Sequence, residues 1–92
     1  MVLVTILVKS EKYGKNCLGC IDEKGKFIRP IKPGGFDDKD VIMDNGKLVA
    51  IFDLVDMEFC GTIPIKHHTE NMKFTLNQTI RFVKTLDETE QI

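Results

Sequence analysis

MVLVTILV, at residues 1–8, is the stretch that decides the fold class of this 92-residue chain. Most of its residues are branched at Cβ, the type of side chain that favours strands: Val2, Val4, Thr5, Ile6 and Val8. The stretch is too short for a membrane-spanning helix, which needs about twenty apolar residues. Its basic neighbour Lys9 follows it, whereas a secretory signal carries basic residues in front. We therefore expect a central strand buried on both faces and, for want of an export or membrane signal, a cytoplasmic protein.

Beyond this strand, glycine and proline divide the first half of the chain into short elements. A polar turn at residues 11–16 and a tight turn at 22–26 each contain a glycine able to adopt positive φ. They separate two further strands, 17–22 and 26–31, which we expect to form a hairpin. Pro30 cannot donate a ladder hydrogen bond, so we expect its end of the strand at a sheet edge or a bulge.

The second half is less regular. Residues 32–46 are rich in Gly, Pro, Asn and Asp, and predict a loop with one helical turn at 37–41. Residues 47–60 predict a long strand bent near Asp53, with a helix as the alternative. A loop at 61–71 follows, then strands at 73–75 and 79–84, and a short helix start at Asp87 with Glu90 at capping-box spacing.

These elements predict one domain, residues 1–92, of the mainly β class. A composition of 42% hydrophobic and 29% charged residues fits one globular domain of this length. Five strands with one long bent member fit a small five-stranded barrel or a strongly twisted antiparallel sheet.

Charge is unevenly distributed along the chain. Residues 9–32 contain seven basic and three acidic residues, whereas residues 36–60 contain two basic and seven acidic ones. The basic side chains can follow a phosphate backbone, with the acidic region facing away, or they can simply protect strand edges. The net charge of −1, the absence of Trp and the single Tyr13 exclude a strongly basic, aromatic-rich binding surface.

The cysteines suggest a zinc site, because Cys17-x-x-Cys20 could combine with Cys60 and a histidine to give four ligands. An odd spacing on a strand, however, sends Cys17 and Cys20 to opposite faces. A thioredoxin-like pair would lie at a helix N-terminus. We expect reduced, metal-free thiols that act as small hydrophobic residues, and we predict no cofactor.

Two polar groups stand out in apolar or loop surroundings. Arg29 lies within an apolar strand, and an ion pair with Asp53 or Glu70 would satisfy it; the alternative is an anion site at its guanidinium. His68, Glu70 and Asn71 either tie down their own loop or form an acid–base pair. No Ser or Cys is placed as a nucleophile, so we predict no catalytic residue and favour a protein that is not an enzyme.

Several segments in order resemble the dual OB domain-containing proteins. They are Lys9-Ser10-x-Lys12, Cys17 to Ile21, Phe27-Ile28-Arg29-Pro30-Ile31, Leu48 to Val55, and His68-x-Glu70-Asn71-Met72. In that family Trp is usual at the positions of Phe27 and Met72, and Gly at the position of Cys20. The resemblance implies an OB-like fold and a nucleic-acid-binding role.

Three functions remain open from the sequence. The first is binding of single-stranded DNA or RNA, with stacking on Tyr13 and Phe27 and phosphate contacts by five basic residues: Lys9, Lys12, Lys15, Lys26 and Arg29. The second is a site for a small anionic ligand, formed by Arg29, Asp53, His68, Glu70 and Asn71. The third is an interaction subunit whose edge strands pair into a homo-oligomer.

Overall fold

Seven strands and one short 3₁₀ helix form the fold in the computed structural model, which describes residues 2–62, 71–76, 78–87 and 89. The elements are β1 (Val2–Lys12), β2 (Lys15–Asp22), β3 (Phe27–Ile31), η1 (Asp38–Val41), β4 (Asp53–Met57), β5 (Phe59–Thr62), β6 (Asn71–Phe74) and β7 (Arg81–Thr85). The mainly β class and the helical turn at 37–41 are thus confirmed. Within these ranges no helix is long and apolar enough to cross a membrane.

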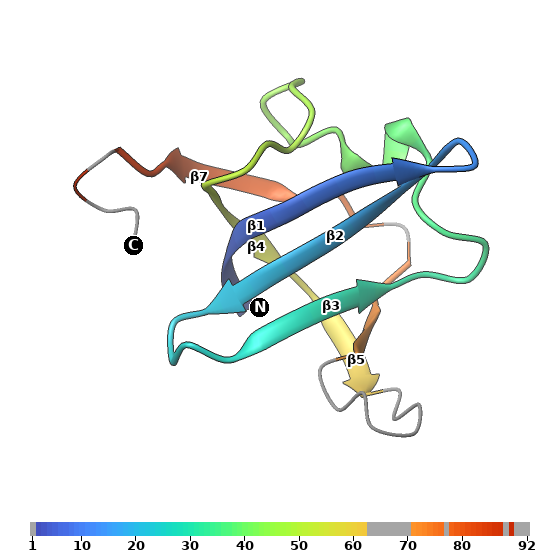
Figure 1. Ribbon diagram of the computed structural model, residues 1–92, viewed down its shortest axis with the longest axis horizontal. Coiled ribbons are helices and arrows are strands. Elements are labelled where there is room, and N and C mark those ends of the chain that lie inside the picture. Colours follow the sequence, from blue (N-terminus) through green and yellow to red (C-terminus); the bar gives the residue numbers. More distant parts are fainter. Residues whose placement is uncertain (1, 63–70, 77, 88, 90–92) are drawn as a thin grey trace.

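The strands form one sheet in the order β5-β6-β3-β2-β1-β4-β7. All neighbours are antiparallel except β3 and β6, which are parallel. A single residue, Glu58, separates β4 from β5, although β5 ends one side of the sheet and β4 lies near the other. The sheet therefore curls into a half-barrel, and β1, β2 and β3 form a layer that crosses in front of β4 and β5 (Figure 1).

The prediction of five strands and of one long strand over 47–60 was wrong. The chain turns at Ile51–Phe52, where Phe52 has a φ of 74°, and only then enters β4. The Phe52 N–H donates to the Ile6 carbonyl at 2.7 Å, and its carbonyl accepts from the Leu86 N–H at 2.9 Å. Contacts with two distant segments therefore hold a backbone conformation that is costly for a bulky residue.

β1 is central, as predicted, with β2 on one side and β4 on the other. It is not buried on both faces: Val4 and Ile6 are buried, whereas Val8 is 46% exposed. The register with β2 shifts between Ile6 and Val8, and such a bulge re-aims the following side chains. Val8 and Ser10 consequently lie on the outer face of the sheet.

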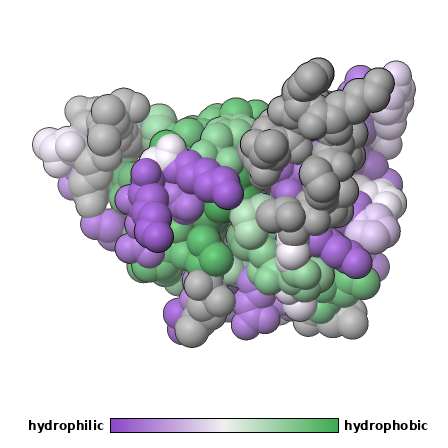
Figure 2. Space-filling model, turned by 90° about the horizontal axis from the view of Figure 1, so that it is seen from below, coloured by the Kyte–Doolittle hydropathy of each residue, from purple (hydrophilic) through white to green (hydrophobic). Residues whose placement is uncertain are grey.

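The core fills the concave side of the sheet. Its buried members include Leu18, Ile28, Val55 and Met57, and Phe36 packs edge-to-face on Phe74 with ring centroids 5.0 Å apart. Figure 2 views the molecule from below, where hydrophobic residues reach the surface beside hydrophilic ones. Burial of this shared apolar surface is the main stabilising contribution to so small a domain.

Two further local predictions concern Pro30 and Asp87. β3 lies between β2 and β6, but it pairs with β2 only at Phe27 and Ile28 and with β6 from Arg29 onward. The Pro30 end of the strand is thus an open edge on its β2 side, as predicted, although Pro30 itself is buried. The predicted helix start at Asp87 is not matched in the described residues, where the Asp87 carboxylate accepts hydrogen bonds from the Thr89 N–H and hydroxyl in a turn. Glu90, the other half of the predicted capping box, is outside the described residues.

Candidate functional site

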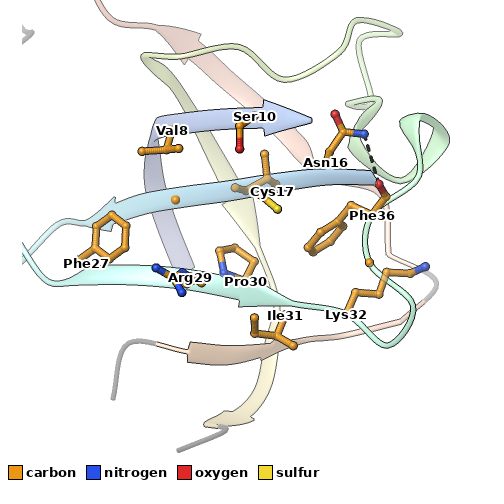
Figure 3. A pocket seen from close by; sticks show the side chains of 13 residues that line it. Val8, Ser10, Asn16, Cys17, Phe27, Arg29, Pro30, Ile31, Lys32 and Phe36 are labelled. Carbon is orange, nitrogen blue, oxygen red and sulfur yellow. Dashed lines mark hydrogen bonds between the residues drawn. The ribbon is translucent and has the colours of Figure 1, made fainter. Parts of the chain in front are cut away.

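A groove of about 370 Å³ lies on the outer face of β1, β2 and β3 (Figure 3). Its lining is mostly apolar, with a few polar groups between: Val8, Ser10, Asn16, Cys17, Leu18, Gly19, Phe27, Arg29, Pro30, Ile31, Lys32, Gly35 and Phe36. These residues come from three adjacent strands and the loop after β3. The volume falls in the range of small-ligand sites, which begins at about 300 Å³.

The groove opens because Pro30 ends the pairing of β2 with β3. The Asp22 N–H donates to the Lys26 carbonyl at 2.9 Å, and hydrogen-bonded pairs alternate along an antiparallel ladder. After Cys20↔Ile28, the next such pair would join Leu18 to Pro30, which has no N–H to donate. From Arg29 onward β3 pairs with β6 instead, and the space left beside β2 is the groove.

Gly19 and Phe27 form one end of this groove. A Cβ placed on Gly19 would lie 2.8 Å from Cζ of Phe27 and 3.2 Å from Cβ of Val8. The aromatic ring therefore lies directly on the Gly19 backbone, and a larger residue at position 19 would displace the ring. Phe27 remains 38% exposed, so part of its ring is available to a ligand.

Arg29 contributes a guanidinium to the groove (Figure 3). The predicted ion pair with Asp53 was wrong, because Asp53 is buried on β4 and accepts from the Ala50 N–H at 2.9 Å and the Thr85 hydroxyl at 2.7 Å. Glu70, the other predicted partner, is outside the described residues. Arg29 is exposed, and among the residues that the structure describes no carboxylate pairs with it.

The two lysines beside the groove are paired. The Lys15 ammonium donates to the Asp37 carboxylate, and Lys32 Nζ lies 3.1 Å from Asp40 Oδ2. The prediction that the acidic region faces away from the basic region was therefore wrong, because the two regions form ion pairs at two points. The hydrogen bond from Lys15 and the positive charge of that lysine lower the pKa of the Asp37 carboxyl.

The other predicted phosphate-binding lysines are divided between the faces. Lys12 is paired with Lys15 in the register, on the same face as the groove, whereas Lys9 is paired with Leu18 on the buried side. Lys26 is exposed in the turn before β3. Tyr13 is 92% exposed, and the Lys12 ammonium lies 5.4 Å from its ring centroid.

The cysteine pair is split as its spacing predicts. Cys17 is exposed and lines the groove, whereas Cys20 is buried, and burial raises the pKa of the Cys20 thiol to about 12. Two thiols on opposite faces do not offer a common metal site. Within the described ranges no group of three or more His, Cys, Asp and Glu side chains could hold a metal ion.

Of the predicted polar cluster, the structure describes two members, and neither of them is at the groove. Asn71 is buried on β6, Asp53 lies on β4, and neither lines the groove. His68 is outside the described residues, as is Glu70. Sequence reasoning also missed Ser10, Gly19 and Phe36 as lining residues; the interruption at Pro30 was the signal that could have located them.

A second, smaller pocket of about 230 Å³ is lined by Asp56, Glu58, Gln78, Thr79 and Arg81. Arg81 Nη2 lies 2.9 Å from Oδ2 of the buried Asp56, and Gln78 bonds the backbone of Glu58 in both directions. These contacts join β4 to the segment that leads into β7, which indicates a structural role.

Comparison with known proteins identifies a family for this chain. No curated protein and no solved structure matches the chain. A family model, described as the dual OB-containing domain, matches residues 2–91, almost the whole chain.

Proposed function

Since this chain belongs to the dual OB-containing domain family, we propose that it binds single-stranded nucleic acid in the groove on β1, β2 and β3. OB folds bind oligonucleotides on the face of their second and third strands and the adjoining loops. The groove of this chain lies on the corresponding face, between β2 and β3. Position in the fold therefore supports the proposal.

One observation carries it: Phe27 offers an exposed part of its ring at the end of a groove that also holds the guanidinium of Arg29, which pairs with no carboxylate in the part of the chain that the structure describes. A base can stack on an aromatic face while a guanidinium binds the neighbouring phosphate. The apolar residues between them suit the base and sugar. Lys12, on the same face, extends the basic surface toward Tyr13.

The test is a fluorescence anisotropy titration of labelled single-stranded oligonucleotides at two salt concentrations. Non-specific binding reaches a Kd of about 10⁻⁴ M at its weak limit, so the protein is taken to about 100 µM. Arg29→Gln should weaken binding and flatten the log–log salt slope by about 0.7, the value for one phosphate contact on a single strand. Phe27→Leu keeps an apolar contact but loses stacking, which contributes about 1–3 kcal/mol per base.

The matched control is Lys47→Gln, which removes one positive charge from an exposed turn that does not line the groove. It should leave the affinity within about twofold. Absence of binding by the wild type at low salt would refute the proposal. Binding of a small anionic molecule in place of an oligonucleotide, lost on Arg29→Gln, would favour the small-ligand alternative, since the groove volume suits one.

A further inference from the structure

An acidic turn, defined here as residues 37–40, contacts the rim of the groove at three points. Asp37 accepts from the Lys15 ammonium, Asp38 Oδ1 accepts from Asn16 Nδ2 at 3.0 Å, and Asp40 Oδ2 accepts from Lys32 Nζ at 3.1 Å. Lys32 and Asn16 both line the groove. Lys15 packs against Gly35, a lining residue of the groove: its Cβ, Cγ and Cδ lie 3.2–3.5 Å from the position of a Cβ on Gly35.

The turn is fixed in this position from both ends. Before it, Phe36 is buried and its carbonyl accepts from the Asn16 N–H at 2.8 Å. After it, Val41 is buried in the core. Within it, the Asp37 N–H donates to Asp40 Oδ2 at 2.8 Å, and the Asp40 N–H to the Asp37 carbonyl at 3.0 Å. The backbone of the acidic turn therefore holds the carboxylates of Asp37 and Asp40 in position to pair with Lys15 and Lys32.

We propose that the acidic turn takes Lys15 and Lys32 out of phosphate binding, so that the groove accepts one nucleotide of a single strand, with its phosphate on Arg29. The inference rests on the proposed function and specifies its ligand. Of the two cations that line the groove, Lys32 is paired, whereas Arg29 has no carboxylate partner among the described residues. A phosphate at Lys15 or Lys32 must compete with a carboxylate for the ammonium, and the negative charge of the acidic turn repels the phosphate.

The size and lining of the groove agree with a ligand of this kind. Its volume of about 370 Å³ lies near the lower limit for small-ligand sites. One end presents Phe27 for a base, and Ile31 and Pro30 supply apolar surface between that ring and the paired Lys32. The ligand class is thus an aromatic base joined to a single phosphate diester.

The test compares the wild type with the double variant Asp37→Asn/Asp40→Asn in the anisotropy assay. Freeing two lysines should steepen the log–log salt slope by about 1.4, at about 0.7 for each phosphate contact. With this steeper slope, the affinity of the double variant relative to the wild type should rise about 25-fold when the salt concentration falls tenfold, from 1 M to 0.1 M. Glu11→Gln/Glu23→Gln is the matched control: it removes the same charge from two exposed residues that pair with no described side chain and should change neither quantity.

A second double variant, in which the two lysines become glutamine, tests the same inference and leaves the residues of the acidic turn unchanged. Lys15→Gln/Lys32→Gln should leave wild-type affinity within about twofold, but should abolish the gain in the Asp37→Asn/Asp40→Asn background. A tenfold loss in the wild-type background would overturn the inference, since the lysines would then already bind phosphate.

Folding of each variant is checked by thermal unfolding. In the Asp37→Asn/Asp40→Asn variant, the side chain at position 40 retains an oxygen that can accept the hydrogen bond from the N–H of residue 37. Binding by the wild type with no gain in the asparagine variant would overturn this inference alone. Failure of every variant to bind would overturn the proposed function, and this inference with it.

Discussion

Pro30 shapes the candidate site through the hydrogen bond that it cannot make. Its missing N–H falls where the β2–β3 ladder would continue to Leu18, and the strands separate at that point. Gly19 acts by the absence of a Cβ, which lets Phe27 lie on the sheet. Pro30 and Gly19, which have no reactive or polar side chain, thus place the ring of Phe27 and the guanidinium of Arg29 in one groove.

At the same scale, the three cysteines should differ in reactivity toward iodoacetamide. The thiolate is the reacting form, and burial raises the pKa of Cys20 to about 12, so almost none of it is ionised at pH 8. Cys17 and Cys60 are exposed and should be alkylated in the folded protein, whereas Cys20 should react only after denaturation. Peptide mass spectrometry measures this directly; equal labelling of all three thiols in the native state would contradict the burial of Cys20.

Among the elements, the turn that leads into β4 depends on one buried carboxylate. Asp53 joins the turn to β7 by accepting from the Ala50 N–H and the Thr85 hydroxyl. Hydrogen bonds to a charged acceptor contribute more than neutral ones, about 1.5–3 kcal/mol each. This role replaces the ion pair with Arg29 that the sequence predicts.

Asp53→Ala should therefore lower the free energy of unfolding by about 2–4 kcal/mol, measured by urea denaturation. Thr85→Val removes one of the two bonds and should cost less, and the double variant should cost no more than Asp53→Ala alone. Glu23→Ala, on an exposed side chain in the β2–β3 turn, is the control and should stay within about 0.5 kcal/mol. Full additivity of the Asp53 and Thr85 changes would show that the two side chains do not interact.

For the molecule as a whole, the position of each strand in the sheet determines how stable that strand is against local unfolding. β1 has a neighbour on each side and carries the buried Val4 and Ile6, whereas β7 ends the sheet and is largely exposed. Glu58 connects the strands that lie near opposite ends of the sheet order, so the half-barrel closes on itself through one covalent link.

Hydrogen exchange should follow that order. Amides in β1 and β4 should exchange most slowly, because opening them disrupts the shared core. Amides in β7 should exchange faster, since β4 is its one neighbour among the described strands. Exchange followed by NMR or mass spectrometry provides the measurement. Protection in β7 equal to that in β1 would mean that a further chain covers the free edge, as an oligomer formed by edge pairing requires.

The sequence by itself determined the features that depend on neighbouring residues. β-branched residues fixed the strand at β1, positive φ at Gly14 and Gly25 fixed the tight turns, and the odd spacing of Cys17 and Cys20 separated their faces. The family resemblance is confirmed over residues 2–91. These signals are local, because strand propensity, turn geometry and side-chain alternation act within a few residues.

Only the tertiary structure decided which charges meet and where the groove opens. Lys15 and Asp37 are 22 residues apart, and Asp53 and Thr85 are 32 apart; their pairing depends on which strands become neighbours. The same holds for Phe52, whose left-handed backbone is held by Ile6 and Leu86, and for β3, which is placed in the sheet interior by its parallel pairing with β6. Composition and spacing do not specify such neighbours, because they arise when distant apolar faces are buried together.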